Sequence, residues 1–406
     1  MDSLPTVLLR PGEADRIVAG HPWIYQGSIL RLTQPADDGA LVQVKDHRQR
    51  FVGVGFLNSR SRIRVRMIAS ERVVVDEGFF EERIRAALAV RRKHLPEAAS
   101  FRVVNAESDS LSGLIVDRYE DVLVLQMSSL GMDRRKDMII GALQKVFSPG
   151  AILERNDIGA RKFEGLPDAH GVVAGKVPAD GAVIRVQLNG LNFEVDLLAG
   201  HKTGLYLDQQ LNYRLVADLI SRSPGGQVLD AFTFQGGFAI HAARAGAAHV
   251  HAIDQSAEAL AAATRNAGAN GLADRCSFEA VNVFDWLKGQ TAVKQNEKLI
   301  PRFDAIILDP PSFTRNRAAV PDALRGYKEI HVRALKLLKQ CGLLASFCCS
   351  HHVDARMFQD VILSAAYDTR RLLRKVTAFT QSPDHPIIPM IPETEYLKGF
   401  AFEVVR

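Results

Sequence analysis

From Leu205 onward, the sequence alternates short apolar runs with longer helical stretches. Such regular alternation is typical of a doubly wound sheet, in which parallel strands carry helices on both faces. Two of the runs end on reactive side chains: FDAIILDPPSF reaches Asp309 before a Pro-Pro turn, and LLASFCCSHH reaches Cys349. Ligands bind at the carboxyl ends of strands in these sheets, so the pattern predicts an α/β domain with a site at that edge.

A chain of 406 residues has room for two or three domains. The first part shows short alternating runs separated by Gly, Pro and Asp, which predicts a small β-barrel or sandwich. The middle part mixes a helix over FFEERIRAALAVRRKHL with several strands and a second helix, which indicates a compact α+β unit. We therefore divide the chain into residues 1–72, 73–195 and 196–406.

The sequence argues against membrane insertion, a disulfide framework and a metal site. No apolar run approaches the roughly 18 residues that a membrane span needs, and no leader opens the chain, so we expect a cytoplasmic protein. The four cysteines form no CxxC pair. A zinc site of Cys348, Cys349, His351 and His352 fails on spacing, because consecutive strand residues point to opposite faces.

The formal net charge of +5 hints at a polyanionic partner. Within NSRSRIRVRMI, arginine occupies every second position: Arg60, Arg62, Arg64 and Arg66. A strand would place all four guanidinium groups on one face. This face is predicted to be either a ridge that follows a phosphate backbone or an ordinary solvated surface.

The segment GQVLDAFTFQGGFAIHAARAGAAHVHAID has the layout of a nucleotide site. A strand ends at Asp230, Gly236 and Gly237 permit a tight turn into a helix, and the next strand stops at Asp254, which suits a ribose. The loop lacks the G-x-G-x-x-G spacing that favours a pyrophosphate. S-adenosylmethionine, which has no phosphate, suits it better, with Asn282 and Phe284 at the adenine.

With these motifs, the C-terminal segment resembles the class I S-adenosylmethionine-dependent methyltransferases. The whole chain resembles the ribosomal large-subunit (23S) RNA cytosine-5 methyltransferases. The resemblance rests on HPWIYQGSI, ESDSLSGLIVDRYEDVLVLQ, LERND, HKTGLYLDQQLNYR, PDHPII and EYLKGFAFEV. It implies an N-terminal PUA-like β-barrel, a central α+β domain and a C-terminal Rossmann-like methyltransferase domain.

The resemblance also implies the residues that bind S-adenosylmethionine. They are Tyr206, Gln209, Asp230, Phe232, Gly236, Gly237, Asp254, Asn282, Phe284 and Asp309. Gln235 replaces a small hydroxyl residue expected before the two glycines, and Asn282 replaces an aspartate that contacts the adenine amino group. Asn282 can still accept a hydrogen bond through its carbonyl oxygen, so we expect re-tuned rather than abolished binding.

The resemblance assigns catalysis to Cys349 and Asp309. A thiolate that adds to C6 of cytosine makes C5 nucleophilic, and Asp309 would bind the N3/N4 edge. Cys348 stands where the family has serine, which leaves Cys349 as the matching nucleophile. A buried structural thiol is the alternative interpretation of Cys349. His351 and His352 are open candidates for the base that removes the C5 proton.

The expected substrate is an exposed or extruded base in 23S ribosomal RNA or a large-subunit assembly intermediate. Phe313 is predicted either to pack on that base or to fill its own loop. A homodimer is compatible with the sequence. The alternatives are methylation of a nucleobase nitrogen, for which Cys349 is dispensable, and a non-catalytic RNA-binding assembly factor. A nicotinamide oxidoreductase would need glycines that bind the cofactor's phosphates, and this sequence lacks them.

Overall fold

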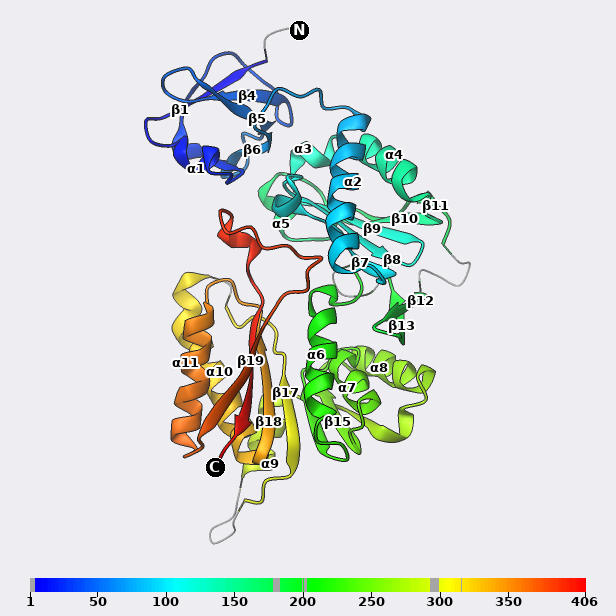
Figure 1. Cartoon of the computed structure of the whole chain (residues 1–406). Helices are drawn as coiled ribbons and strands as arrows, with labels where there is room; N and C mark the ends of the chain where they lie inside the picture. Colours follow the sequence, from blue (N-terminus) through cyan, green and yellow to red (C-terminus); the bar gives the residue numbers. More distant parts are fainter. Residues whose placement is uncertain (1–3, 178–182, 199, 201–202, 293–298, 315) are drawn as a thin grey trace. The chain divides into compact units, whose positions relative to one another are not determined.

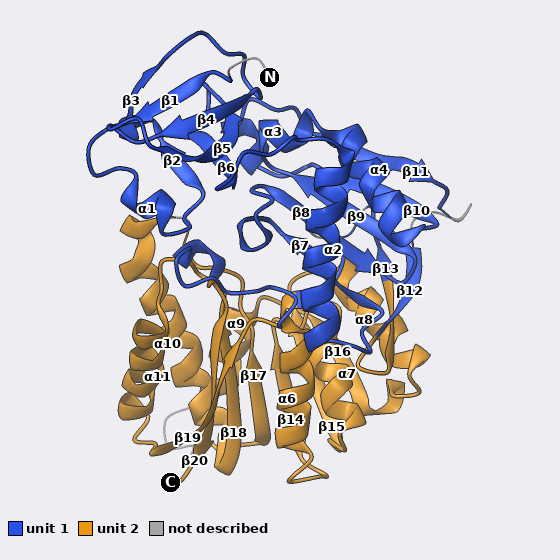
Figure 2. Ribbon diagram, turned by 45° about the horizontal axis from the view of Figure 1, so that its top comes forward, with its two compact units in different colours: residues 1–187, 195–207, 383–394 blue, residues 188–194, 208–382, 395–406 orange. Residues whose placement is uncertain are grey.

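The computed structural model describes residues 4–177, 183–198, 200, 203–292, 299–314 and 316–406. Contacts divide the chain into two compact units (Figure 2). Unit 1 comprises residues 1–187, 195–207 and 383–394, and unit 2 comprises residues 188–194, 208–382 and 395–406. Each unit is therefore built from segments that are distant in the sequence.

The N-terminal part of unit 1 is a six-stranded sheet with the order β2-β6-β5-β4-β1-β3. Its strands are β1 (Thr6–Leu9), β2 (Trp23–Tyr25), β3 (Ile29–Leu32), β4 (Leu41–Lys45), β5 (Phe51–Leu57) and β6 (Ile63–Ala69), with the short helix α1 (Asp15–Val18). Alternation of apolar residues directs Val7, Leu9, Val42, Val44 and Val65 into its own core. The predicted small β-domain is confirmed.

The next part of unit 1 is a five-stranded sheet with the order β11-β10-β9-β8-β7, in which only β9 and β10 run parallel. Helix α2 begins after Asp76, whose carboxylate accepts a hydrogen bond from the Phe79 amide at 2.9 Å. Helices α2 and α4 lie side by side over this sheet (Figure 1). The bounds are α2 (Glu77–His94), β7 (Ser100–Asn105), β8 (Leu114–Tyr119), β9 (Val122–Met127), α3 (Leu130–Asp133), α4 (Lys136–Phe147), β10 (Ala151–Arg155), α5 (Ala160–Phe163) and β11 (His170–Gly175).

The two sheets of unit 1 share buried side chains. Val54 and Phe56 of β5 belong to the same apolar cluster as Phe80 of α2 and Leu125 of β9. The predicted α+β unit is thus present and packs directly against the N-terminal sheet. A hairpin follows, made of β12 (Val183–Leu188) and β13 (Leu191–Asp196). Its turn residues Asn189 and Gly190 both have positive φ, as a two-residue hairpin turn requires.

Unit 2 contains a seven-stranded sheet with the order β16-β15-β14-β17-β18-β20-β19, parallel except for β20. Helices α6, α7 and α8 lie on one side and α9, α10 and α11 on the other (Figure 1). The predicted doubly wound sheet is confirmed. The bounds are α6 (Gln210–Ile220), β14 (Gln227–Ala231), α7 (Gly237–Arg244), β15 (His249–Asp254), α8 (Ala257–Ala269), β16 (Cys276–Ala280), α9 (Val283–Thr291), β17 (Phe303–Leu308), α10 (Val320–Leu337), β18 (Leu338–Cys348), α11 (Ala355–Asp368), β19 (Leu373–Thr380) and β20 (Lys398–Val404).

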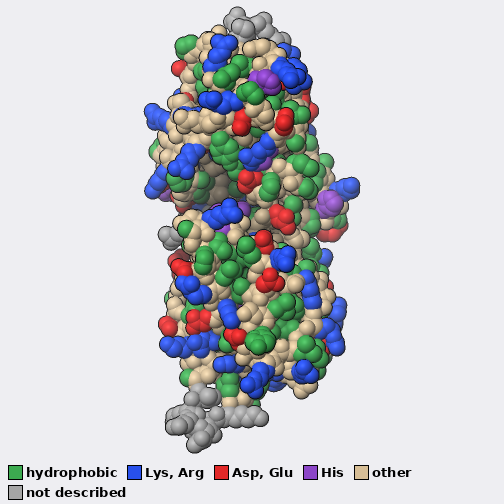
Figure 3. Space-filling view, turned by 90° about the vertical axis from the view of Figure 1, so that its left-hand side faces the viewer, with side chains coloured by type: hydrophobic (Ala, Val, Ile, Leu, Met, Phe, Trp, Pro, Cys, Tyr) green, Lys and Arg blue, Asp and Glu red, His purple; other side chains and the backbone are tan. Residues whose placement is uncertain are grey.

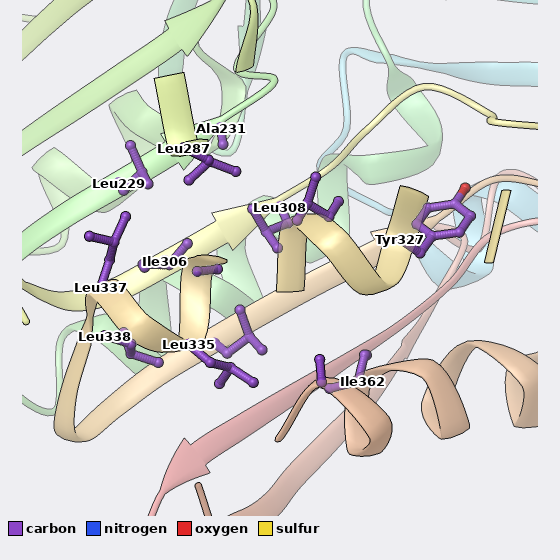
Figure 4. Close-up of a cluster of buried hydrophobic side chains, with 14 of the residues drawn as sticks. Leu229, Ala231, Leu287, Ile306, Leu308, Tyr327, Leu335, Leu337, Leu338 and Ile362 are labelled. Carbon is purple, nitrogen blue, oxygen red and sulfur yellow. The ribbon is translucent and has the colours of Figure 1, made fainter. Parts of the chain in front are cut away.

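The main core of unit 2 lies between the sheet and helices α9–α11. Leu229 of β14, Ile306 and Leu308 of β17, and Leu335 of α10 are fully buried in it (Figure 4). A strand buried on both faces is apolar nearly throughout, which explains the continuous run FDAIIL of β17. Side chains of β14, β17 and β18 all belong to this core, which packs the three strands together and sets where their carboxyl ends lie.

Candidate functional site

The carboxyl ends of β14, β15, β17 and β18 meet at one edge of the unit 2 sheet. The strand order reverses between β14 and β17, because β14 is followed by β15 on one side and β17 lies on the other. This reversal is the topological switch point where open α/β sheets bind ligands. Asp230, Asp254, Asp309 and Cys349 all stand at or just beyond the ends of these strands.

Asp230 is fully buried at the end of β14. One carboxylate oxygen accepts a hydrogen bond from the Thr233 hydroxyl at 2.6 Å, whereas Oδ1 has no hydrogen-bond partner among the described residues. Burial raises the pKa of Asp230 to about 7. A buried carboxyl group with an oxygen that lacks a hydrogen-bond partner among the described residues is costly and points to a functional role for this loop.

The loop that follows Asp230 has an unusual backbone. Phe232 and Phe234 have φ values of 68° and 51°, and Gly236 has 84°. Non-glycine residues rarely adopt this region, and such strain concentrates at ligand-binding sites. Asp254 stabilises the loop, because its Oδ2 accepts a hydrogen bond from the Phe234 amide and its Oδ1 from the Ser256 amide, both at 3.0 Å.

Gly236 and Gly237 are each required in this loop, for different local reasons. Gly236 is the N-cap of α7 and needs its positive φ. Gly237 begins α7, and a Cβ at this position would lie 2.6 Å from Cζ of the Tyr213 ring. The helix therefore starts where the sequence predicts, and a second glycine is required by the packing of Tyr213.

Asn282 and Phe284 lie at the start of α9, after β16. The Asn282 Oδ1 caps the helix by accepting hydrogen bonds from the Phe284 and Asp285 amides at 3.0 and 3.2 Å. The carbonyl oxygen that we expected to meet the adenine amino group is therefore occupied, and the side-chain amide remains as a donor. The Phe284 ring lies 6.3 Å from the Phe232 ring, which gives this end of the site an aromatic lining.

Asp309 directly follows β17 and is tied to the neighbouring strand, since its amide donates to the Ala231 carbonyl at 3.4 Å. The Gln209 Nε2 donates a hydrogen bond to Asp309 Oδ2 at 3.0 Å. Gln209 belongs to a 3-10 helix (Leu207–Gln209) at the start of α6. Tyr206, predicted with it, falls in unit 1, so the two residues belong to different units.

The residues on either side of Cys349 share one partner. The Cys348 thiol donates to the Tyr327 hydroxyl at 3.4 Å, and the Ser350 and Tyr327 hydroxyl oxygens lie 3.0 Å apart. Cys348 and Ser350 are fully buried, whereas Cys349 is partly exposed. Ser350 also bonds Ser312 at 2.8 Å, which links the ends of β18 and β17.

Phe313 follows the Pro-Pro turn and packs inside its own unit. Its ring lies 4.5 Å from that of Tyr327 and 5.6 Å from that of Phe284. It is partly buried against the main core. These contacts favour the loop-packing interpretation of Phe313 over stacking on a substrate base.

The arginines at alternate positions do not share one exposed strand face, contrary to the prediction that a strand places all four guanidinium groups together. Strand β6 begins only at Ile63, so Arg60 and Arg62 precede it and are exposed. The Arg66 side chain is 13% exposed and its guanidinium pairs with Glu164 at 3.0 Å and Glu107 at 3.5 Å. Glu107 lies in the 3-10 helix Ala106–Asp109 that follows β7, and Glu164 directly follows α5, so Arg66 links β6 to segments that connect strands of the second sheet.

Some residues of the site escaped sequence reasoning. Asn212, Tyr327, Ser312 and Ser350 act through neighbours that only the fold brings together. Asn212 donates to Gln209 Oε1 at 2.7 Å and to the Thr380 carbonyl at 2.9 Å. The sequence signal was limited to Asn212 standing one helical turn from Gln209, within the segment HKTGLYLDQQLNYR.

The described residues contain neither a helix suited to spanning a membrane nor a cluster of side chains suited to holding a metal ion. None of the helices in that part of the chain is long and apolar enough to cross a membrane. Over the same residues, no group of three or more His, Cys, Asp or Glu side chains is placed to hold a metal ion.

Two family models match the chain. A PUA-like domain matches residues 7–70, and an S-adenosylmethionine-dependent methyltransferase matches residues 182–390. The chain is also 37% identical to ribosomal RNA large subunit methyltransferase I of Klebsiella pneumoniae, with all of both chains covered. Its identity to the protein of the same name from Shewanella denitrificans is 36%, covering 98% of this chain and 99% of that one.

Solved structures share the fold at lower identity. A SAM-dependent methyltransferase from Streptococcus mutans superposes with a TM-score of 0.81 at 19% identity, covering 98% of this chain and all of the other. A methyltransferase in complex with SAH gives 0.82 at 20% identity with the same coverage. The architecture is thus a PUA-like domain, a central mixed-sheet domain and a Rossmann-like methyltransferase domain. The chain is an S-adenosylmethionine-dependent methyltransferase and belongs to the ribosomal RNA large subunit methyltransferase I family.

Proposed function

We propose that this enzyme methylates C5 of a cytosine in large-subunit ribosomal RNA through a covalent bond between Cys349 and C6 of the base. One observation carries the proposal. Cys348 and Ser350 are both turned to Tyr327 and buried, whereas Cys349 between them is partly exposed. It stands beyond β18, next to the strand that ends before Asp309.

The residues at the β14–β15 edge fit S-adenosylmethionine. Bound there, this cofactor supplies an electrophilic methyl group on a sulfonium. Asp254, which two backbone amides hold at the end of β15, would bind the ribose hydroxyls, and Phe232 and Phe284 would offer apolar faces for the adenine. Asn282 would donate from its side-chain amide to a ring nitrogen of adenine, because its carbonyl oxygen caps α9.

Cys349 is the nucleophile of the proposed reaction. Its thiolate adds to C6, the pyrimidine loses aromaticity, and C5 becomes nucleophilic enough to accept a methyl group. Loss of the C5 proton then expels the thiolate and restores the ring. His351, one of the two candidates for the base that takes this proton, is exposed, and its ring is tilted against that of Tyr396 with the centroids 5.6 Å apart.

Asp309 recognises the base in this proposal. A carboxylate held beside the N3/N4 edge selects cytosine and stabilises the charge that develops during addition. Gln209 restrains this carboxylate from one side, and the Ala231 carbonyl restrains the backbone of Asp309. The same restraint keeps Asp309 at the switch point, between the proposed cofactor site and Cys349.

Exposed arginines of unit 1, Arg60 and Arg62 foremost, contact the phosphate backbone of the RNA in this proposal. Figure 3 shows Lys and Arg side chains spread over one face of the molecule among Asp and Glu rather than gathered in one patch. Such contacts would position the RNA without reading its sequence. Reading then depends on the single base that enters the site.

The test is incubation of the enzyme with labelled methyl donor and either deproteinised large-subunit RNA or ribosomal particles, followed by mass spectrometry of the nucleosides. We expect 5-methylcytidine as product. Cys349→Ser should lose it and Cys348→Ser should retain it, because Cys348 is a buried partner of Tyr327. Full turnover by Cys349→Ala, or a methyl group on a base nitrogen, would reject the covalent mechanism.

A further inference from the structure

Lys398 is a buried lysine to which the proposed mechanism gives no role. It begins β20 and pairs with Cys348 of β18. The residue is 9% exposed, and its Nζ donates hydrogen bonds to the carbonyl oxygens of Ser350 and Val353, both at 2.6 Å. These carbonyls belong to the turn that immediately follows Cys349, so the ammonium group lies inside this turn.

Burial and nearby groups that carry or can acquire negative charge act on Lys398 in opposite directions. Burial lowers the pKa of Lys398, and charges on the surrounding groups act in the opposite direction. The groups that do so come from the end of β18, the N-cap of α11 and the residue range before β20: Cys348, Cys349, Asp354 and Glu395. Electrostatic interaction is mutual, so the Lys398 ammonium also favours an ionised thiol at its side.

The Lys398 ammonium does not favour ionisation of Cys348 and Cys349 equally. Cys348 is fully buried and donates its thiol hydrogen to Tyr327, whose own pKa is raised chiefly by burial and further by Cys348. Cys349 is partly exposed, so its thiolate can be solvated while the ammonium stays bonded to the carbonyls of the turn that follows it.

We propose that Lys398 is a positioning residue that fixes the turn after Cys349 and stabilises the Cys349 thiolate. On ionisation, the S–H bond breaks, its electron pair stays on Sγ, and the proton passes to water. The contribution of a stabilised Cys349 thiolate to methyl transfer rests on the proposed function. The ionisation itself does not, and it can be measured without turnover.

The experiment measures the rate at which iodoacetamide alkylates Cys349 as a function of pH, by mass spectrometry of the Cys349 peptide. It uses the full chain without methyl donor and with the exposed Cys341 changed to Ser. In this background we expect a midpoint below 8.5, the ordinary pKa of cysteine. Lys398→Met should raise the midpoint by about one pH unit, and Lys398→Arg should keep it near the parent value.

Lys375→Met is the matched control. Lys375 lies on β19, bonds Gln359 at 2.7 Å and is exposed, so its removal deletes a charge from the same sheet away from the turn. Its midpoint should not move. A Lys398→Met midpoint equal to the parent's, or a change in rate at every pH with no shift, would assign Lys398 a merely structural role.

The parent measurement keeps the proposal falsifiable even if Lys398→Met does not fold, since a parent midpoint of 8.5 or higher overturns it. Failure of the proposed function has a different signature. Cys349→Ser would then retain turnover, whatever the alkylation profile of Cys349.

Discussion

Gln209 donates a hydrogen bond from Nε2 to Oδ2 of Asp309, with 3.0 Å between the two atoms. The Asn212 side-chain amide donates hydrogen bonds to Gln209 Oε1 at 2.7 Å and to the Thr380 carbonyl oxygen at 2.9 Å. The amide of Gln209 is thereby fixed in one orientation, with its NH2 group toward the carboxylate. A residue at the start of α6 thus orients an acid that follows β17.

Gln209→Ala should lower kcat/KM by about 10- to 100-fold, because a hydrogen bond to a charged group contributes about 1.5–3 kcal/mol. The measurement is steady-state methyl transfer to RNA. Gln210→Ala is the neighbouring control, since Gln210 is the next residue along the chain and the hydrogen bond to Asp309 Oδ2 comes from Gln209. Equal kinetics for Gln209→Ala and the parent would mean that Asp309 needs no partner.

Asp230 should make stability depend on pH. Its folded-state pKa of about 7 exceeds the ordinary 3.8, so the folded protein keeps a proton that the unfolded chain has released. The stabilising contribution is fully present below pH 4 and is lost as pH rises toward 7. Its total approaches about 4 kcal/mol on the scale of 1.36 kcal/mol for each pKa unit.

The check is urea unfolding of the parent and Asp230→Asn at several values between pH 4 and 8. The free energy of unfolding of the parent, relative to the variant, should fall with rising pH across this interval. A difference that stays constant would show that Asp230 is ionised throughout.

Gly237→Ala should destabilise the fold by about 1–3 kcal/mol and weaken binding of S-adenosylmethionine, because the new methyl group would overlap the Tyr213 ring. Gly268→Ala within α8 is the matched control. A Cβ there has no neighbour within 4 Å, so that substitution should stabilise the helix by up to about 1 kcal/mol. Thermal unfolding and calorimetric titration with the cofactor measure both quantities.

Arg62 and Arg66 should respond differently to substitution by alanine. Arg66→Ala leaves Glu164, which is 4% exposed, without its guanidinium partner and should cost about 3–5 kcal/mol of stability. Arg62→Ala should leave stability unchanged and reduce the salt dependence of RNA binding. Unfolding curves and filter-binding titrations at several salt concentrations distinguish the two. If the Arg66→Ala protein were stable but lost RNA affinity, Arg66 would contact RNA, as the hypothesis of a phosphate-binding ridge holds.

The sequence by itself determined the order of elements, the strand ends and the residue types at the site. Apolar runs that end on Asp230, Asp254 and Asp309 are local patterns. Because strands of a parallel sheet are buried on both faces, such runs are expected to form its strands. The same holds for the glycines, because the backbone conformation at Gly236 excludes most other residues.

Only the tertiary structure decided which side chains act together. Tyr327 lies more than twenty residues from Ser350 and Gln209 lies a hundred from Asp309, and no periodicity links them. The same cause explains Arg66, which has the spacing of an exposed strand face but pairs with Glu164, nearly a hundred residues later in the chain and directly after α5. Hydrogen bonds and ion pairs depend on positions in space within a few tenths of an ångström, and long-range packing alone sets those positions.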